Sequence, residues 1–139
     1  QFGLDLLWRP RVFTANRYEA LSGEIVADQA TRLVWQRAGS KFPCTWQQAH
    51  TYIQSLNVEH FAGRDRWRLP TIDELITLLR PTPQFQELCI APLFDFTQRW
   101  LWSSDRRSFT AAYYVDAQMG FVGWQDFSAP YYVRAVCSM

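Results

Sequence analysis

Residues 61–79 have the sequence FAGRDRWRLPTIDELITLL and carry the clearest structural signal in the chain. Thr71 is followed three residues later by Glu74. This is the spacing of a capping box, in which the hydroxyl caps a backbone amide and the carboxylate reaches back. The apolar residues behind this start share one helical face: Ile72, Leu75, Ile76 and Leu79. We predict an amphipathic helix that begins after Thr71 and is ended by Pro81 and Pro83.

The preceding segment predicts a second helix by the same signal. Thr45 is followed three residues later by Gln48, which again has the spacing of a capping box. The apolar residues on one face of this helix are Trp46, Ala49, Ile53 and Leu56. Each helix therefore has one side to bury against another layer of the protein.

Strand signals lie on both sides of the helices. Residues 23–37, GEIVADQATRLVWQR, contain β-branched and aromatic residues around a polar turn from Asp28 to Thr31, which predicts a β-hairpin. After Pro83, four apolar runs of period two predict antiparallel strands: RWLWSS (99–104), AAYYVDA (111–117), FVGWQDF (121–127) and YYVRAVC (131–137). This order predicts an α+β fold, with two helices packed on antiparallel sheet and hairpins.

The length of 139 residues suits one domain. We predict an extended lead-in over residues 1–22, with one short strand, that is part of the domain or packs on it. The domain itself is predicted over residues 23–139. Because the sequence begins with Gln1 and not with Met, we expect a segment of a longer protein or a processed product, and we favour an origin in a larger multidomain protein.

Composition excludes several classes of partner. The formal net charge of +1 gives no global field that would gather nucleic acid. No apolar run approaches the length of about 18 residues that a membrane span needs. Lys41 is the only lysine, and an arginine-rich basic set leaves binding of an anionic ligand open, although codon usage in a GC-rich genome is the simpler explanation.

Cysteine and histidine residues do not form a catalytic or metal-binding pattern. Cys44, Cys89 and Cys137 lack CxxC spacing, and His50 and His60 share no metal-ligand pattern with them. No Ser-His-Asp or Cys-His arrangement favours nucleophilic catalysis. We expect no metal, no cofactor and no enzymatic activity, while the odd number of cysteines leaves the cellular compartment open.

Several motifs in order resemble the C-terminal domain family of Legionella collagen-like proteins, from Gly23 to Cys137. They are TRLVWQR, FAGRDRWRLPTIDELITLL, LWSS, AAYYVDAQMGFV and YYVRAVC. The resemblance implies a C-type-lectin-like fold and an adhesion or ligand-recognition role. One member of that family resembles a binder of sulfated glycosaminoglycans. A resemblance of this kind implies a fold more strongly than an activity.

The chain departs from the family pattern at three places. Arg32 stands where the family usually has Gly, Arg66 is inserted before Trp67, and Leu101 precedes Trp102 where Tyr is usual. The calcium-dependent sugar motifs of true C-type lectins are absent, and residues 124–126, Trp-Gln-Asp, match only part of one of them. Calcium-dependent sugar binding is therefore not expected.

The resemblance also implies a disulfide. In folds of the C-type-lectin type, a disulfide often links the first helix to the last strand, which would pair Cys44 with Cys137.

The predicted strands and loops near the C-terminus contain the best candidates for a ligand-binding surface, because rigid aromatic side chains occur there beside adaptable polar groups. The candidate residues are Asp105, Arg106, Arg107, Trp124, Gln125, Asp126, Tyr131 and Tyr132. Since neighbours in a strand point to opposite faces, part of this set must belong to the core. We expect one of the rings of Tyr131 and Tyr132 to face inward and the other outward.

Two other motifs have structural explanations. Arg68 has the carboxylates of Asp65, Asp73 and Glu74 close in sequence, so we expect an ion pair there and not an anion site. Residues 102–104, Trp-Ser-Ser, are expected to end a strand, with the hydroxyls satisfying backbone groups at a turn and not binding a sugar.

We therefore predict a non-catalytic recognition or adhesion module that binds a protein or glycan, with the cell surface or a secreted location favoured over the cytoplasm. It could be the variable domain of a diversity-generating retroelement. The alternative is a regulatory or oligomerisation domain attached to a catalytic domain such as a kinase, with Trp8 and Phe13 packing against the neighbour. An enzyme using a redox-active cysteine pair or a metal is a third hypothesis.

Overall fold

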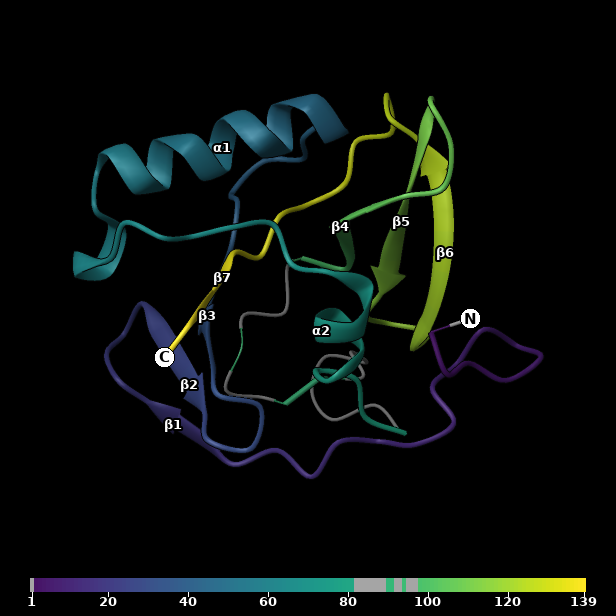
Figure 1. Ribbon diagram of the computed structural model, residues 1–139, viewed down its shortest axis with the longest axis horizontal. Coiled ribbons are helices and arrows are strands. Elements are labelled where there is room, and N and C mark those ends of the chain that lie inside the picture. The colour runs from purple at the N-terminus through teal and green to yellow at the C-terminus, as the bar shows by residue number, and fades with distance from the viewer. Residues whose placement is uncertain (1, 82–89, 92–93, 95–97) are drawn as a thin grey trace.

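The computed structural model of the chain describes residues 2–81, 90–91, 94 and 98–139 (Figure 1). In these described residues, two antiparallel sheets and two α-helices form the fold, which confirms the predicted α+β class. The first sheet has the order β1-β2-β3-β7, with strands Tyr18–Ala20, Ile25–Asp28, Leu33–Gln36 and Val136–Ser138. The second has the order β4-β5-β6, with strands Trp100–Arg106, Ala111–Asp116 and Phe121–Asp126.

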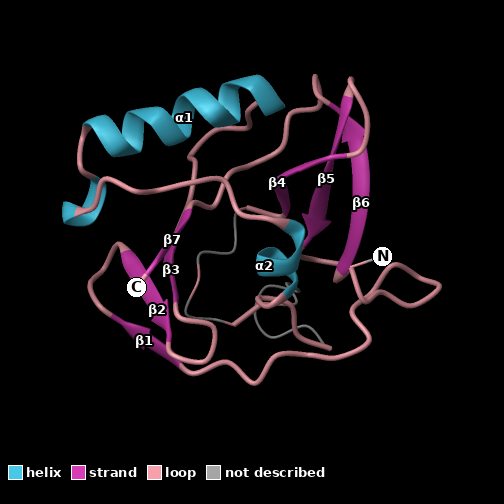
Figure 2. Ribbon diagram, in the orientation of Figure 1, coloured by secondary structure: helices cyan, strands magenta, loops and turns pink. Residues whose placement is uncertain are grey.

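Helix α1 spans Trp46–Val58 and helix α2 spans Ile72–Ile76, with the short 3-10 turn η1 at Phe61–Gly63 between them. Figure 2 shows the long helix α1 along one side of the molecule and the short helix α2 beside the β4-β5-β6 sheet. Contacts of α2 with β4 and β5 hold it there. The sequence YEA of β1 lies within the predicted lead-in and pairs with β2, which ties the lead-in to the first sheet.

Both capping boxes are confirmed. The Thr45 hydroxyl accepts from the Gln48 amide, and the Thr71 hydroxyl accepts from the Glu74 amide, with the reciprocal side-chain bonds also present. In α1 the buried residues are those of the predicted face: Trp46, Ala49, Ile53 and Leu56. The predicted extent of α2 is wrong, because the helix ends at the cap residue Thr77, before Pro81. Pro83 lies outside the described residues.

The predicted hairpin at residues 23–37 is confirmed, with β2 and β3 pairing in register from Ile25 opposite Gln36 to Asp28 opposite Leu33. The prediction that residues 102–104 end a strand is wrong. Strand β4 continues to Arg106, and its pairing with β5 shifts register between Trp102 and Arg106. Between these two pairs the register advances four residues along β4 but two along β5, so β4 accommodates two extra residues without ending.

The closing run at residues 131–137 was predicted as one strand, and this is wrong. Only Val136–Ser138 forms a strand, β7, which pairs with β3. Upstream of it, Tyr131 bridges to Cys44 and Tyr132 bridges to Leu101. The segment therefore crosses from the second sheet to the first, and its backbone bonds go to several elements in turn.

The buried apolar residues that the structure describes form two core clusters. One surrounds α2 and includes Trp35, Ile72, Leu75 and Leu101, and the other surrounds α1 and includes Trp46, Ile53, Trp67, Trp102 and Val133. Strands β2 and β3 contribute to both clusters, because successive side chains in a strand point to opposite faces. The β2-β3 hairpin is thus the layer shared by the two halves of the core.

Candidate functional site

The end of β4, the turn after it and strand β6 form an exposed surface that combines arginine with aromatic rings. The Arg107 guanidinium lies 4.6 Å from the ring centroid of Trp124. The Arg106 guanidinium lies 5.9 Å from the Phe109 ring and 5.8 Å from the Phe127 ring. Both cations are therefore held over aromatic faces, an arrangement that attracts them electrostatically.

The lead-in extends this surface. The rings of Trp8 and Trp124 are 5.7 Å apart, and the Trp8 carbonyl accepts a hydrogen bond of 2.8 Å from the Val122 amide. Trp124 is 47% exposed and Phe109 is 90% exposed, so large rings face solvent here. We call this the arginine–aromatic surface; its residues are Trp8, Arg106, Arg107, Phe109 and Trp124.

The charges of this surface are available to a ligand. Within the described ranges, the ion pairs join His60 to Asp65, Arg68 to Glu74 and Arg99 to Asp116. Neither Arg106 nor Arg107 takes part in one. Guanidinium groups of this kind offer planar, forked donors that match sulfate, phosphate and carboxylate groups.

Two further predicted residues, Gln125 and Asp126, lie exposed at the end of β6, next to Trp124. The Asp126 carboxylate accepts bonds of 3.0 Å from the Ser128 amide and 2.8 Å from its hydroxyl. These bonds lower the pKa of Asp126, which keeps the carboxylate ionised. The surface thus has a negative group at one edge.

Asp105 has a structural role. Its carboxylate accepts a hydrogen bond of 2.7 Å from the Ile72 amide, in the first turn of α2. The bond satisfies one of the amides that a helix start leaves unpaired, and it ties β4 to α2. The Ser103 hydroxyl likewise bonds to the Tyr113 carbonyl at 2.7 Å, as expected for a backbone-satisfying role.

Tyr131 and Tyr132 pack in different places, and both are half-buried, so the expected inward and outward pair is not found. Tyr131 contacts the rings of Trp100, Trp102 and Tyr114, with centroids 5.7, 5.1 and 4.6 Å away. Tyr132 packs on the core cluster around α2. Of the eight predicted residues, five are exposed: Arg106, Arg107, Trp124, Gln125 and Asp126. Among these five, Arg107 and Trp124 are in direct contact.

Comparison with protein-family models gives one finding. The model of the Lcl C-terminal domain matches residues 24–137, most of the chain. The chain belongs to the Lcl C-terminal domain family. A comparison with curated proteins gave no match. The family is named for a C-terminal domain and not for a catalytic activity. The residues that match the family model begin after the lead-in, which contributes Trp8 to the surface.

The central motif of the Lcl C-terminal domain match contains the expected ion pair. Arg68 donates to both carboxylate oxygens of Glu74, at 2.5 and 2.7 Å. Burial opposes ionisation of Glu74, but the bonds from Arg68 and Thr71 outweigh it and lower the pKa of Glu74. Arg68 is therefore a structural residue of the family motif and is not part of the candidate site.

The predicted disulfide between Cys44 and Cys137 is absent from the structure, where both thiols are free. Cys44 lies at the start of α1, where its thiol donates to the Phe42 carbonyl. Cys137 is buried in β7 and faces the Arg64 side chain. The two thiols therefore have separate surroundings. Cys89 lies outside the described residues.

Over the part of the chain that the structure describes, no group of three or more His, Cys, Asp and Glu residues is arranged to hold a metal ion. The helices of that same part are all too short or too polar to cross a membrane.

Two residues of the arginine–aromatic surface were missed from the sequence. Phe109 follows Arg106, Arg107 and a serine in an otherwise polar turn, and a lone aromatic residue in such a turn was the available signal. Trp8 was assigned to the lead-in, about a hundred residues before Trp124. No local pattern could have joined these two rings.

Proposed function

We propose that the chain is a non-catalytic recognition module that binds a protein or glycan ligand through the arginine–aromatic surface. The stacking of Arg107 on the exposed ring of Trp124 is the observation that carries this proposal. Aromatic rings supply rigid contact area at low entropic cost, and arginine supplies directional donors. Membership of the Lcl C-terminal domain family supports a binding role over a catalytic one.

The chemistry of the surface favours an anionic ligand, and we propose a glycan with sulfate or carboxylate groups. Arg106 and Arg107 have no carboxylate partner in the described chain, so a ligand anion displaces no internal ion pair. Sugar rings pack on aromatic faces while their substituents meet the guanidinium forks.

We expect Arg107→Ala and Trp124→Ala each to weaken binding of a heparin oligosaccharide at least tenfold, equivalent to about 1.4 kcal/mol. Each change removes one half of the stacked pair. Isothermal titration calorimetry measures the affinities, and circular dichroism checks the fold.

Arg66→Ala serves as the matched control, since Arg66 is also exposed but lies outside the surface. A desulfated oligosaccharide of the same length controls for the anionic groups. Equal affinities of the wild type, Arg107→Ala and Trp124→Ala would place the site elsewhere. Failure of the wild type to prefer the sulfated form would exclude the anionic glycan.

We further propose that this surface is the place where sequence variation would concentrate if the domain belongs to a diversity-generating retroelement. Gln125 and Asp126, together with Arg107, have exposed side chains that could change without loss of core packing. A template repeat near the gene that differs from it at adenines would support this extension, and sequencing of the locus is the test.

The exposed apolar residues of the lead-in favour a second function, oligomerisation or docking on a neighbouring domain. Leu6, Leu7 and Val12 are 98%, 69% and 80% exposed. Exposed apolar surface of this kind often marks an interaction site. Phe13, by contrast, packs against the core cluster around α2, so the predicted packing of Phe13 against a neighbouring domain is not favoured.

If the lead-in mediates self-association, Leu6→Ser combined with Leu7→Ser is expected to shift the protein from oligomer to monomer, because apolar contact area is lost. Light scattering after size exclusion measures the mass. Val58→Ser, on the exposed face of α1, is the matched control. A monomeric wild type at all accessible concentrations would rule out oligomerisation through the lead-in.

A further inference from the structure

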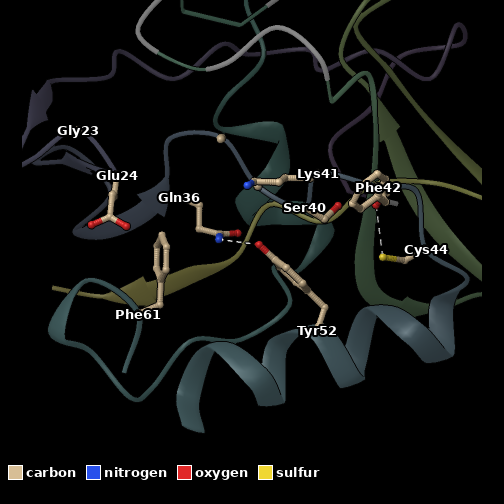
Figure 3. Close-up of a pocket in the computed structure, with 11 residues that line it drawn as sticks. Gly23, Glu24, Gln36, Ser40, Lys41, Phe42, Cys44, Tyr52 and Phe61 are labelled. Carbon is tan, nitrogen blue, oxygen red and sulfur yellow. Dashed lines mark hydrogen bonds between the residues drawn. The ribbon is translucent and has the colours of Figure 1, made fainter. Parts of the chain in front are cut away.

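A cavity of about 500 Å³ lies between the loop after β3, helix α1 and the turn η1 (Figure 3). Phe42, Tyr52 and Phe61 supply its apolar walls. Its size falls in the range of small-molecule sites in proteins. It shares no lining residue with the arginine–aromatic surface, so a ligand here would be independent of the proposed function.

The loop that forms one wall is held firmly by the core. The Ser40 amide donates to the Val133 carbonyl at 2.8 Å, and the Val133 amide donates to the Ser40 hydroxyl at 3.0 Å. The Gln98 side chain donates to the Ser40 carbonyl, and the Cys44 amide donates to the Tyr131 carbonyl. Because these bonds fix both ends of the loop, the cavity is preformed, which lowers the entropic cost of binding.

The base of the cavity carries a positioned hydroxyl. Gln36 is buried, and its side chain accepts from the Ala135 amide and donates to the Tyr52 hydroxyl, both at 2.8 Å. That hydroxyl donates to no acceptor in the described chain, so its hydrogen is available to a ligand. Figure 3 shows Gln36 and Tyr52 meeting within the cavity.

Two opposite charges border the same space. Figure 3 places Glu24 on the side of Phe61 and Lys41 on the side of Phe42. Lys41 is the only lysine of the chain. Within the described residues neither group forms an ion pair, with the other or with a third residue. The rim therefore presents a separate anion and cation across an apolar cavity.

We propose that this cavity binds a small apolar zwitterion, an amino acid or dipeptide with an aromatic or aliphatic side chain. Its ammonium group pairs with Glu24 and its carboxylate with Lys41, while the side chain packs between Phe42 and Phe61. The Tyr52 hydroxyl donates to the ligand carboxylate or to the peptide carbonyl. A ligand with a single charge leaves one rim charge unpaired, and a purely polar ligand leaves the aromatic walls uncovered.

Calorimetric titration with L-phenylalanine and with L-phenylalanyl-L-alanine tests the proposal and separates the amino acid from the dipeptide. N-acetyl-L-phenylalanine lacks the ammonium group, and L-phenylalaninamide lacks the carboxylate. We expect each blocked form to bind about tenfold more weakly than L-phenylalanine, because one charge-assisted contact is lost.

Variants at the rim show which contact each blocked form loses. With Glu24→Gln, L-phenylalanine and its N-acetyl form should bind equally, and with Lys41→Gln, L-phenylalanine and its amide should bind equally. Glu59→Gln and Arg66→Gln remove comparable exposed charges outside the cavity and should preserve the preference for the zwitterion. Both rim residues are exposed, so the fold does not depend on them.

Alkylation of Cys44 gives a second readout, because its half-buried thiol lines the cavity. A bound ligand should slow its reaction with iodoacetamide, as followed by peptide mass mapping, and leave the rate at Cys137 unchanged. The proposal is overturned if neither zwitterion binds at concentrations up to about 10 mM. It is also overturned if binding is indifferent to the rim variants and to blocking of the ligand.

Discussion

Replacing Gly39 by alanine is expected to lower the free energy of unfolding by about 3 kcal/mol. Gly39 has a φ of +109°, a conformation that L side chains rarely adopt. A Cβ atom there would lie 2.4 Å from the Val133 carbonyl oxygen, so the backbone would have to move. The two hydrogen bonds between Ser40 and Val133 hold the loop after β3 against the segment that contains Val133 and resist that movement.

Gly23→Ala is the matched control, since Gly23 borders the same cavity but has no atom within 4 Å of the added Cβ. Its effect should stay within about 0.5 kcal/mol. Chemical denaturation of both variants measures the difference. If Gly39→Ala is as stable as Gly23→Ala, the close approach of the loop to Val133 is wrong.

Replacing Asp28 by alanine is expected to lower the free energy of unfolding by a similar amount, about 3 kcal/mol. The buried Asp28 carboxylate accepts from the Arg17 and Ala30 amides at 2.9 and 3.0 Å. It also accepts from the Asn16 amide group at 2.7 Å and the Thr31 hydroxyl at 3.1 Å. The side chain thus joins the lead-in to the hairpin turn. Its removal leaves the Arg17 and Ala30 amides and the Thr31 hydroxyl without this acceptor, while the Asn16 side chain keeps its bond to the Thr77 carbonyl.

The Asp28 effect should depend on pH. Burial raises the pKa of Asp28, but the hydrogen bonds outweigh it and leave the pKa below its ordinary value. A carboxyl group whose pKa is lowered on folding adds stability above its unfolded pKa of about 4, and this stability is lost as the pH falls through the folded pKa. The difference between the wild type and Asp28→Ala should therefore shrink below about pH 4 in denaturation experiments. A difference that is constant with pH would contradict an ionised Asp28.

The features that the sequence predicted correctly depend on near neighbours in the chain. Each capping box needs residues only three positions apart, and the β2-β3 hairpin needs a polar turn between two apolar runs. The ion pair of Arg68 with Glu74 spans six residues. Local hydrogen bonds and periodicity are sufficient to specify such features.

The features that the sequence missed depend on contacts between distant segments. The run at residues 131–137 alternates as a strand does, but its backbone partners belong to β3, β4, residue 44 and residue 68. From the sequence, Asp105 has the pattern of a surface residue, because the Ile72 amide that donates to its carboxylate lies 33 positions earlier in the chain. Tyr131 and Tyr132 are both half-buried because a core cluster lies on either side of this segment.

The departure at Arg32 has a physical consequence. The residue adopts a left-handed backbone conformation with a φ of +62°, which explains why glycine suits this position in the family pattern. The turn is retained because the Arg32 amide donates to the Asp28 carbonyl and the Arg32 carbonyl accepts from the Met139 amide. Arginine is therefore tolerated at some cost in backbone strain.

The candidate site was predicted in part because exposed polar and aromatic residues cluster in the sequence near residues 105–107 and 124–126. The sequence could not show that Arg107 stacks on Trp124, since strand β5 separates them. It also could not show that the lead-in brings Trp8 to the same place.

The most direct test of ligand recognition through the arginine–aromatic surface is a map of the tryptophan indole N–H signals in a two-dimensional NMR spectrum during titration with a heparin oligosaccharide. We predict that the signals of Trp124 and Trp8 shift, while those of the buried Trp35 and Trp102 stay in place. Shifts confined to other tryptophans, or no shift of Trp124 at saturation, would contradict recognition through the arginine–aromatic surface.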